Sequence, residues 1–113
     1  MKTLLTNEKL KWYGTDLDGT LVETFPPEFD LENAKPISEN CKFIRKVAKE
    51  GWKIIIYTAR PSFEYIDIEK WLKKYRIPFR QIVTGKTLCK YYFDDKAINP
   101  NCKECMERIN KSL

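Results

Sequence analysis

Apolar runs that alternate with helical patterns of apolar positions organise the chain. Residues 52–57 include three consecutive isoleucines, which is typical of a strand buried within a parallel sheet. Shorter apolar or aromatic runs predict further strands over 10–15, 79–84 and 91–93. The first of these is less uniformly apolar than a central strand, because it includes Lys11.

Helical spacing of apolar residues predicts helices between these strands and after the last one. Ser38 is a suitable N-cap for the first helix, and Gly51 suits its C-terminal stop. The second helix is predicted over 62–75 and ends before Pro78, and the last begins near Asn99-Pro100. The inward-facing residues of the first two helices are Ile37, Cys41, Ile44, Val47 and Ala48, and Tyr65, Ile68, Trp71, Leu72 and Tyr75.

The segment 21–36 follows neither pattern. It is rich in proline, phenylalanine and acidic residues, which predicts a loop or flap over the turn after the first strand. Its acidic character argues against a polyanion lying along it.

The alternation of strands and helices predicts an α/β fold with a parallel sheet and right-handed crossovers. Ligands of such sheets bind beyond the carboxyl ends of the strands. Six polar residues stand at those predicted ends: Asp16, Asp18, Thr58, Lys86, Asp94 and Asp95. Each alone has an ordinary explanation, such as a helix cap or a solvated loop, but their joint placement predicts one active site.

The stretch Asp16-Leu17-Asp18-Gly19-Thr20 has the clearest chemical character. Asp16 and Asp18 lie two positions apart, so on a strand they share one face. Two such carboxylates repel by roughly 4 kcal/mol at about 4 Å when the effective dielectric is near 20. We therefore expect a cation or a shared proton between them, although the stretch by itself is equally compatible with an ordinary Asp-Gly turn.

Composition narrows the available chemistry. The length of 113 residues predicts a single domain over 1–113. The chain has no histidine, so acid–base chemistry must use carboxylates, lysine, tyrosine or cysteine. The net charge of +5 weakly favours anionic partners, nucleic acid among them, without specifying one.

Targeting signals are not evident in the sequence. No apolar run approaches the ~18 residues of a membrane span, and the apolar start at 1–5 is too short for a secretory segment. We therefore expect no membrane partner and a cytoplasmic location. The four cysteines, Cys41, Cys89, Cys102 and Cys105, are then expected to be reduced thiols.

The pair Cys102-x-x-Cys105 has three interpretations. A zinc site would need two further ligands, and a redox pair would lie at the start of a helix near a sheet. Cys102, Cys105, Met106 and Ile109 also follow the spacing of the inward stripe of an amphipathic helix. Plain packing is the interpretation that the spacing favours.

The order of these motifs resembles that of the haloacid dehalogenase superfamily of phosphatases and phosphotransferases. Asp16-Leu17-Asp18-Gly19-Thr20 is similar to the first motif, DxDGT, and Thr58 after the isoleucine run is similar to the second. Lys86 is similar to the third, with the nearby Lys90 as a second candidate, and Asp94-Asp95 is similar to the fourth. The resemblance implies a three-layer α/β/α, Rossmann-like fold.

The resemblance also implies a reaction, the hydrolysis of a phosphomonoester. Asp16 would be the nucleophile that forms an aspartyl-phosphate, and Asp18 would protonate the leaving oxygen and then activate water. Thr58 would hydrogen-bond a phosphoryl oxygen, and Lys86 would neutralise charge on the phosphoryl group. Arg60 either binds the substrate phosphate or forms a structural salt bridge, and both interpretations stay open.

A divalent cation belongs to this expectation. Clustered carboxylates and a phosphate partner favour Mg²⁺, because it prefers oxygen ligands. The expected ligands are Asp16, the main-chain carbonyl of Asp18, and Asp94, with Asp95 binding directly or through water.

The stretches between the motifs are too short for the cap domain that many members of the superfamily carry. We therefore expect an open site that accepts a macromolecular phosphoester, such as a nucleic-acid end or a phosphoprotein, or an oligomer in which a neighbour acts as a lid. A small phosphate ester stays an alternative. A receiver-like phospho-signalling domain and a catalytically silent binding domain are the alternatives to an enzyme, although a receiver should have its paired carboxylates first and its lysine last.

Overall fold

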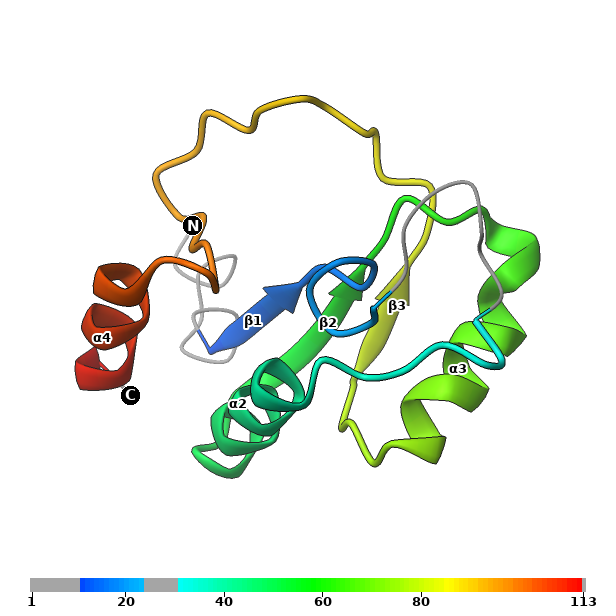
Figure 1. Cartoon of the computed structure of the whole chain (residues 1–113), viewed down its shortest axis with the longest axis horizontal. Coiled ribbons are helices and arrows are strands. Elements are labelled where there is room, and N and C mark those ends of the chain that lie inside the picture. The colour runs from blue at the N-terminus through cyan, green and yellow to red at the C-terminus, as the bar shows by residue number, and fades with distance from the viewer. Residues whose placement is uncertain (1–10, 24–30, 113) are drawn as a thin grey trace, which may run out of the picture.

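A three-stranded parallel sheet lies at the centre of the computed structural model, which describes residues 11–23 and 31–112 (Figure 1). The strands are β1 (Trp12–Thr15), β2 (Lys53–Tyr57) and β3 (Gln81–Val83), in that order across the sheet. Tyr13 pairs with Ile54, and Ile56 pairs with Ile82. These three predicted strands are confirmed with shorter ends, and residue 10 lies outside the described residues.

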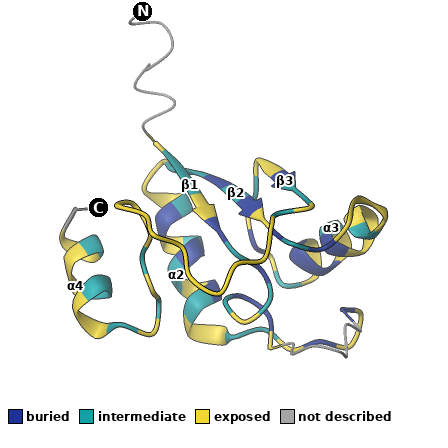
Figure 2. Cartoon of the chain, turned by 90° about the horizontal axis from the view of Figure 1, so that it is seen from above, coloured by how far each residue is buried: buried dark blue, intermediate teal, exposed yellow. Residues whose placement is uncertain are grey.

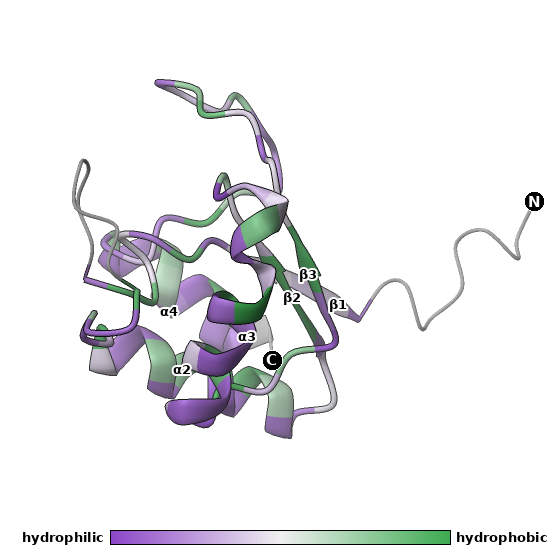
Figure 3. Cartoon of the chain, turned by 90° about the vertical axis from the view of Figure 1, so that its right-hand side faces the viewer, coloured by the Kyte–Doolittle hydropathy of each residue, from purple (hydrophilic) through white to green (hydrophobic). Residues whose placement is uncertain are grey.

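Helices α2 (Ser38–Lys49) and α3 (Tyr65–Lys74) lie on the same side of the sheet (Figure 3). This follows from two right-handed crossovers that step in one direction across parallel strands. The α/β fold class, with a Rossmann-like parallel sheet and no cap domain, is confirmed. The described elements show the sheet and one helical layer of the expected three-layer arrangement.

The helix ends differ slightly from the prediction. Ser38 is the first residue of α2 rather than its N-cap, and the cap residue Ile37 makes no side-chain capping bond. Gly51 ends this helix as predicted, because its φ of 95° is a conformation that favours glycine. The predicted second helix begins with a 3-10 turn, η2 (Ser62–Glu64), before α3 starts.

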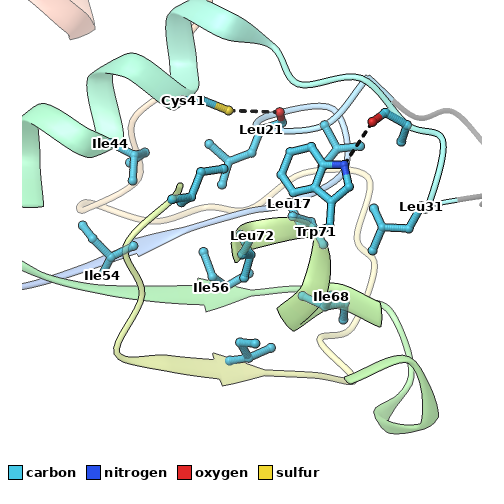
Figure 4. Packing of buried hydrophobic residues seen from close by; sticks show 14 of the residues in the cluster. Leu17, Leu21, Leu31, Cys41, Ile44, Ile54, Ile56, Ile68, Trp71 and Leu72 are labelled. Atoms are coloured by element: carbon cyan, nitrogen blue, oxygen red, sulfur yellow. Dashed lines mark hydrogen bonds between the residues drawn. The ribbon is translucent and has the colours of Figure 1, made fainter. Parts of the chain in front are cut away.

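The hydrophobic core fills the space between the sheet and these two helices (Figure 4). Ile54 and Ile56 of β2 are buried on this face, as alternation along a strand requires. The indole Nε1 of Trp71 donates to the Ala34 carbonyl at 3.0 Å, which ties α3 to the segment before α2. Tyr65 was expected to face inward, but it is 39% exposed because it lies at the junction of η2 and α3.

The segment predicted as a flap is closed at its base. Leu21 and Val22 are fully buried, and their neighbours bond across the loop: Ile37 N donates to the Leu21 carbonyl at 2.8 Å, and Glu23 N donates to the Lys35 carbonyl at 2.8 Å. Residues 24–30 of the predicted flap lie outside the described residues. The chain thus leaves β1 through a buried turn and returns to it before α2 begins.

The predicted strand over 91–93 is wrong. This stretch is irregular, and Tyr91 and Phe93 are 81% and 106% exposed. Figure 2 shows the long connection from β3 to α4 (Lys103–Ser112) as exposed over much of its length. Local bonds replace a sheet ladder here, since the Tyr92 hydroxyl donates to the Thr87 carbonyl at 2.7 Å.

Helix α4 begins later than predicted and stands beside α2. The Asn99 carbonyl accepts a bond from Cys102 N at 3.0 Å, so Asn99 belongs to a turn before the helix. Lys46 Nζ of α2 donates to Asn110 Oδ1 at 2.9 Å. Within the described part of the chain, no helix is long and apolar enough to cross a membrane.

Candidate active site

Asp16 stands directly after β1, at the carboxyl end of the sheet. Its side chain is 43% exposed, and its Oδ1 accepts a hydrogen bond from Leu17 N at 2.8 Å. Burial raises the pKa of the Asp16 carboxyl, and the charge of Asp18 adds to this, while the Leu17 bond and Lys86 act in the opposite direction. The pKa is raised overall, so Asp16 is a partly desolvated carboxyl group at an accessible edge.

The loop after β3 brings Lys86 to Asp16. Lys86 N donates to the Thr58 carbonyl at 3.0 Å, and Gly85 N donates to the Arg60 carbonyl at 2.9 Å. Gly85 has a φ of 77°, which lets the chain turn between these two bonds. Lys86 Nζ then lies 3.8 Å from Asp16 Oδ1.

Aromatic rings hold the same ammonium group. Lys86 Nζ lies 5.3 Å from the centre of the Tyr57 ring and 4.9 Å from that of Tyr92. Lys90, the second candidate for this role, instead lies over the Tyr91 ring at 5.7 Å. Of the two lysines, the structure places Lys86 beside Asp16.

Thr58 organises the turn that follows β2. It is fully buried, its N–H donates to the Val83 carbonyl at 2.9 Å, and its Oγ1 accepts a bond from Arg60 N at 3.1 Å. Together with the bond from Lys86 N, these contacts join the ends of β2 and β3. Thr58 therefore positions the two basic residues on either side of the site.

Arg60 forms ion pairs with two carboxylates. Its Nε and Nη2 donate to Oδ2 and Oδ1 of Asp18 at 2.8 and 2.7 Å, and its Nη1 donates to Glu64 Oε1 at 2.7 Å. Burial alone lowers the pKa of Arg60, but its bonds to both acids outweigh burial and raise it. The structure thus gives Arg60 a salt-bridge role, one of the two interpretations that the sequence left open.

Glu64 is the site residue that sequence reasoning missed. It belongs to η2 and lies four positions after Arg60, with 21% of its side chain exposed. An acid and a base four positions apart at the start of a helix are a recognisable signal for such a pair. The signal is hidden because Arg60 precedes Pro61, and a residue before proline is biased away from helical geometry.

The two aspartates after the predicted fourth strand do not join Asp16 and Asp18. Asp94 Oδ1 accepts a bond from Lys96 N at 2.7 Å, and Asp95 Oδ2 lies 3.5 Å from Lys96 Nζ on the exposed surface. Among residues 11–23 and 31–112, no group of three or more His, Cys, Asp or Glu side chains could hold a metal ion. The physical reason is that residues 91–93 form no strand beside β1.

A large cavity nevertheless connects Asp94 with Asp16. It has a volume of about 880 Å³ and follows β1 between α2 and the C-terminal segment. Its lining includes the aromatic residues Trp12, Tyr13, Phe43, Trp52, Tyr57 and Tyr92. Lys86 and Lys96 line it as well, so the cavity combines aromatic walls with positive charge near a carboxylate.

The donor set of Asp16 fits a hard cation. Both contacts of this carboxylate within the described residues involve Oδ1, so Oδ2 remains as an oxygen donor. Mg²⁺ in enzymes commonly uses one or two carboxylates, with water and substrate phosphate as its other ligands. The carboxylate of Asp18 does not fit this role in the structure, because Arg60 occupies both of its oxygens.

Comparisons with known proteins agree with the fold. A family model for haloacid dehalogenase-like hydrolases matches residues 14–110. The crystal structure of a structural-genomics target from Vibrio cholerae is 28% identical, with a TM-score of 0.69, over 91% of this chain and 99% of that one. A chain of the Pnkp1/Rnl/Hen1 complex is 18% identical, with a TM-score of 0.58, over 74% of this chain and 31% of that one, a likeness of fold alone. No curated protein sequence matches.

The parallel sheet, the acidic turn after β1 and the lysine beyond β3 define a small α/β protein whose charged residues meet at the carboxyl edge of the sheet. The chain belongs to the haloacid dehalogenase-like hydrolase family, since the family model covers most of its length.

Proposed function

We propose that this protein is a Mg²⁺-dependent phosphohydrolase that cleaves a phosphomonoester through an aspartyl-phosphate on Asp16. The observation that carries the proposal is the 3.8 Å approach of Lys86 Nζ to Asp16 Oδ1 at the carboxyl edge of the sheet. A carboxylate can attack phosphorus, and a fixed cation beside it offsets the negative charge of the transferring group. Membership in a hydrolase family supports the same reaction class.

The first step would use Asp16 as the nucleophile. Its carboxylate oxygen forms a bond to phosphorus while the bond from phosphorus to the leaving oxygen breaks. The ammonium group of Lys86 stabilises charge on the phosphoryl oxygens. The leaving oxygen takes a proton from Asp18, which must first separate from Arg60 and take up a proton from solvent, because both of its oxygens accept bonds from the guanidinium.

The second step would release phosphate. Water attacks phosphorus, its proton passes to Asp18, and the bond between phosphorus and Asp16 breaks to restore the free carboxylate. Asp18 accepts this proton only when its carboxylate is released from Arg60, because both of its oxygens accept bonds from the guanidinium in the paired state.

Asp16 Oδ2 and the main-chain carbonyl of Asp18 would hold the Mg²⁺ ion, and Asp94 and Asp95 would complete the set only after the segment that carries them moves toward Asp16. When bound, the cation offsets the charge of the phosphate and of the nearby carboxylates. Asp94 shares the cavity with Asp16, which supports its part in this set.

The open edge of the site supports a substrate that presents its phosphate from outside. The family fold here has no cap domain, and the cavity along β1 extends well beyond Asp16. A phosphorylated nucleic-acid end or a phosphoprotein would fit such an edge. A small phosphate ester would need a second copy of the chain as a lid.

Hydrolysis of an aryl phosphate tests the proposal. We expect turnover that requires Mg²⁺, stops when EDTA is added and is lost in Asp16→Asn, while Lys90→Ala keeps it. A stable phosphorylated protein without turnover would instead identify a receiver-like domain. Absence of both turnover and phosphorylation would identify a silent binding domain.

A further inference from the structure

Two thiols lie within one turn at the start of α4, outside the proposed active site. Cys105 N donates to Cys102 Sγ at 3.3 Å, and both side chains are partly exposed free cysteines. The packing interpretation agrees with the burial pattern, because Cys102, Cys105, Met106 and Ile109 are the partly buried residues between 101 and 111. Met106 and Ile109 line the large cavity, but the lining does not include either cysteine.

A zinc site does not suit this pair. Structural zinc takes four ligands, usually cysteine and histidine, and this chain has no histidine. Within the described residues, no third Cys, Asp or Glu joins the two thiols in a group able to hold a metal. What the position does offer is a pair of neighbouring nucleophiles at the N-terminal end of a helix, where the backbone dipole favours a thiolate.

The two thiols differ chemically. A hydrogen bond from the Cys105 thiol lowers the pKa of Cys102, and the backbone N–H of Cys105 adds to this. The pKa of Cys105 is raised, because its thiol is the donor in that bond. Cys102 is thus the more easily ionised thiol, and Cys105 holds the proton beside it.

We propose that Cys102 and Cys105 form a redox-active dithiol that exchanges with a low-molecular-weight disulfide such as oxidised glutathione. The Cys102 thiolate attacks one sulfur of that disulfide, forming a mixed disulfide and releasing one thiolate. Cys105 then loses its proton and attacks the Cys102 sulfur, which closes the intramolecular disulfide and releases the second thiolate. The two protein thiols are oxidised by two electrons, and the small disulfide is reduced to two thiols.

Redox titration of the full chain tests this assignment. The reduced protein is equilibrated in buffers of varied ratio of reduced to oxidised glutathione, its free thiols are alkylated, and its peptides are weighed by mass spectrometry. We expect a disulfide between Cys102 and Cys105 whose fraction follows the two-electron ratio. Two alkylated thiols at every ratio would overturn the proposal. So would zinc that stays bound to this pair after the protein is loaded with zinc and dialysed against zinc-free buffer.

Variants separate the two roles. Cys105→Ser should trap glutathione on Cys102 as a mixed disulfide. In Cys102→Ser, Cys105 should form this adduct several-fold more slowly than Cys102 does in Cys105→Ser at the same pH. Cys89→Ser is the matched control, because Cys89 is an exposed thiol outside the pair, and it should leave the Cys102–Cys105 titration unchanged. Equal adduct rates at Cys102 and Cys105 in the single variants would overturn the assignment. None of these readouts depends on phosphatase activity.

Discussion

Arg60 holds Asp18 through two parallel hydrogen bonds, from Nε to Oδ2 at 2.8 Å and from Nη2 to Oδ1 at 2.7 Å. The pair joins the turn after β2 to the acidic turn after β1, 42 positions apart in the sequence. The guanidinium is also bonded to Glu64, so two acids share one cation at the edge of the site. The second aspartate of the first motif is therefore held in place by a residue two positions after the second motif.

Loss of this guanidinium should destabilise the fold. Arg60 is 4% exposed, and Arg60→Met would leave Asp18 and Glu64 without their shared cation. We expect a loss of about 2 kcal/mol, less than for a fully buried pair because both acids retain contact with water. Urea unfolding measures it.

A surface pair of the same spacing as Arg60 and Glu64 provides the control. Lys73 and Glu69 are 3.9 Å apart on α3, with 67% and 32% of their side chains exposed. Lys73→Met should change the free energy of unfolding by less than about 0.5 kcal/mol. Equal effects of the two substitutions would contradict the structural role of Arg60.

Lys86 should matter for the chemical step of the proposed reaction. Lys86→Gln removes the charge that faces Asp16, and we expect a loss of about 100-fold in kcat, as for other residues that stabilise transition-state charge. The matched variant Lys90→Gln should have a kcat within about threefold of the wild-type value, because Lys90 does not face Asp16. Steady-state hydrolysis of an aryl phosphate compares them, and a larger effect at Lys90 would reassign the third motif.

Ionisation of Asp16 should lower the free energy of unfolding when divalent cations are absent. Burial raises the folded-state pKa of Asp16 above its ordinary value of 3.8, so the folded chain binds this proton more tightly than the unfolded chain. The stability contributed by the protonated form is present below that ordinary value and is lost as pH rises through the raised pKa.

Asp16→Asn removes this titration. With EDTA present, we expect the variant to be more stable than the wild type near neutral pH, by no more than about 1 kcal/mol because the carboxylate is partly exposed. The difference should shrink as the pH approaches 3.8. Thermal unfolding across this range measures it, and a wild type that gains stability from pH 5 to 7 relative to the variant would contradict the sign.

Trp71 should contribute both packing and a hydrogen bond. Its side chain is 2% exposed, and Trp71→Phe would leave the buried Ala34 carbonyl without the donor at 3.0 Å. We expect a loss of about 1–3 kcal/mol from the unsatisfied acceptor and the lost volume. Phe63→Leu, at a side chain that is 84% exposed, should be nearly neutral in the same urea titration.

The amino-acid sequence by itself determined the three strands, the first two helices and the acidic turn. Apolar alternation and helical spacing are local properties, and the burial of Ile54, Ile56 and Trp71 follows from them. The parallel sheet then required the ends of its strands to meet, which brought Lys86 to Asp16. This pairing could be predicted because it depends on topology rather than on side-chain detail.

Tertiary structure decided what local pattern could not. The aromatic run 91–93 has the composition of a strand, but a strand forms only where a neighbouring edge accepts its hydrogen bonds, and here it stays exposed. Arg60 had two plausible partners in sequence, a phosphate or an acid, and the fold placed two carboxylates within bonding distance. Periodicity depends only on residues that are close in the sequence. Pairing between distant groups depends on where the packed helices and strands place them.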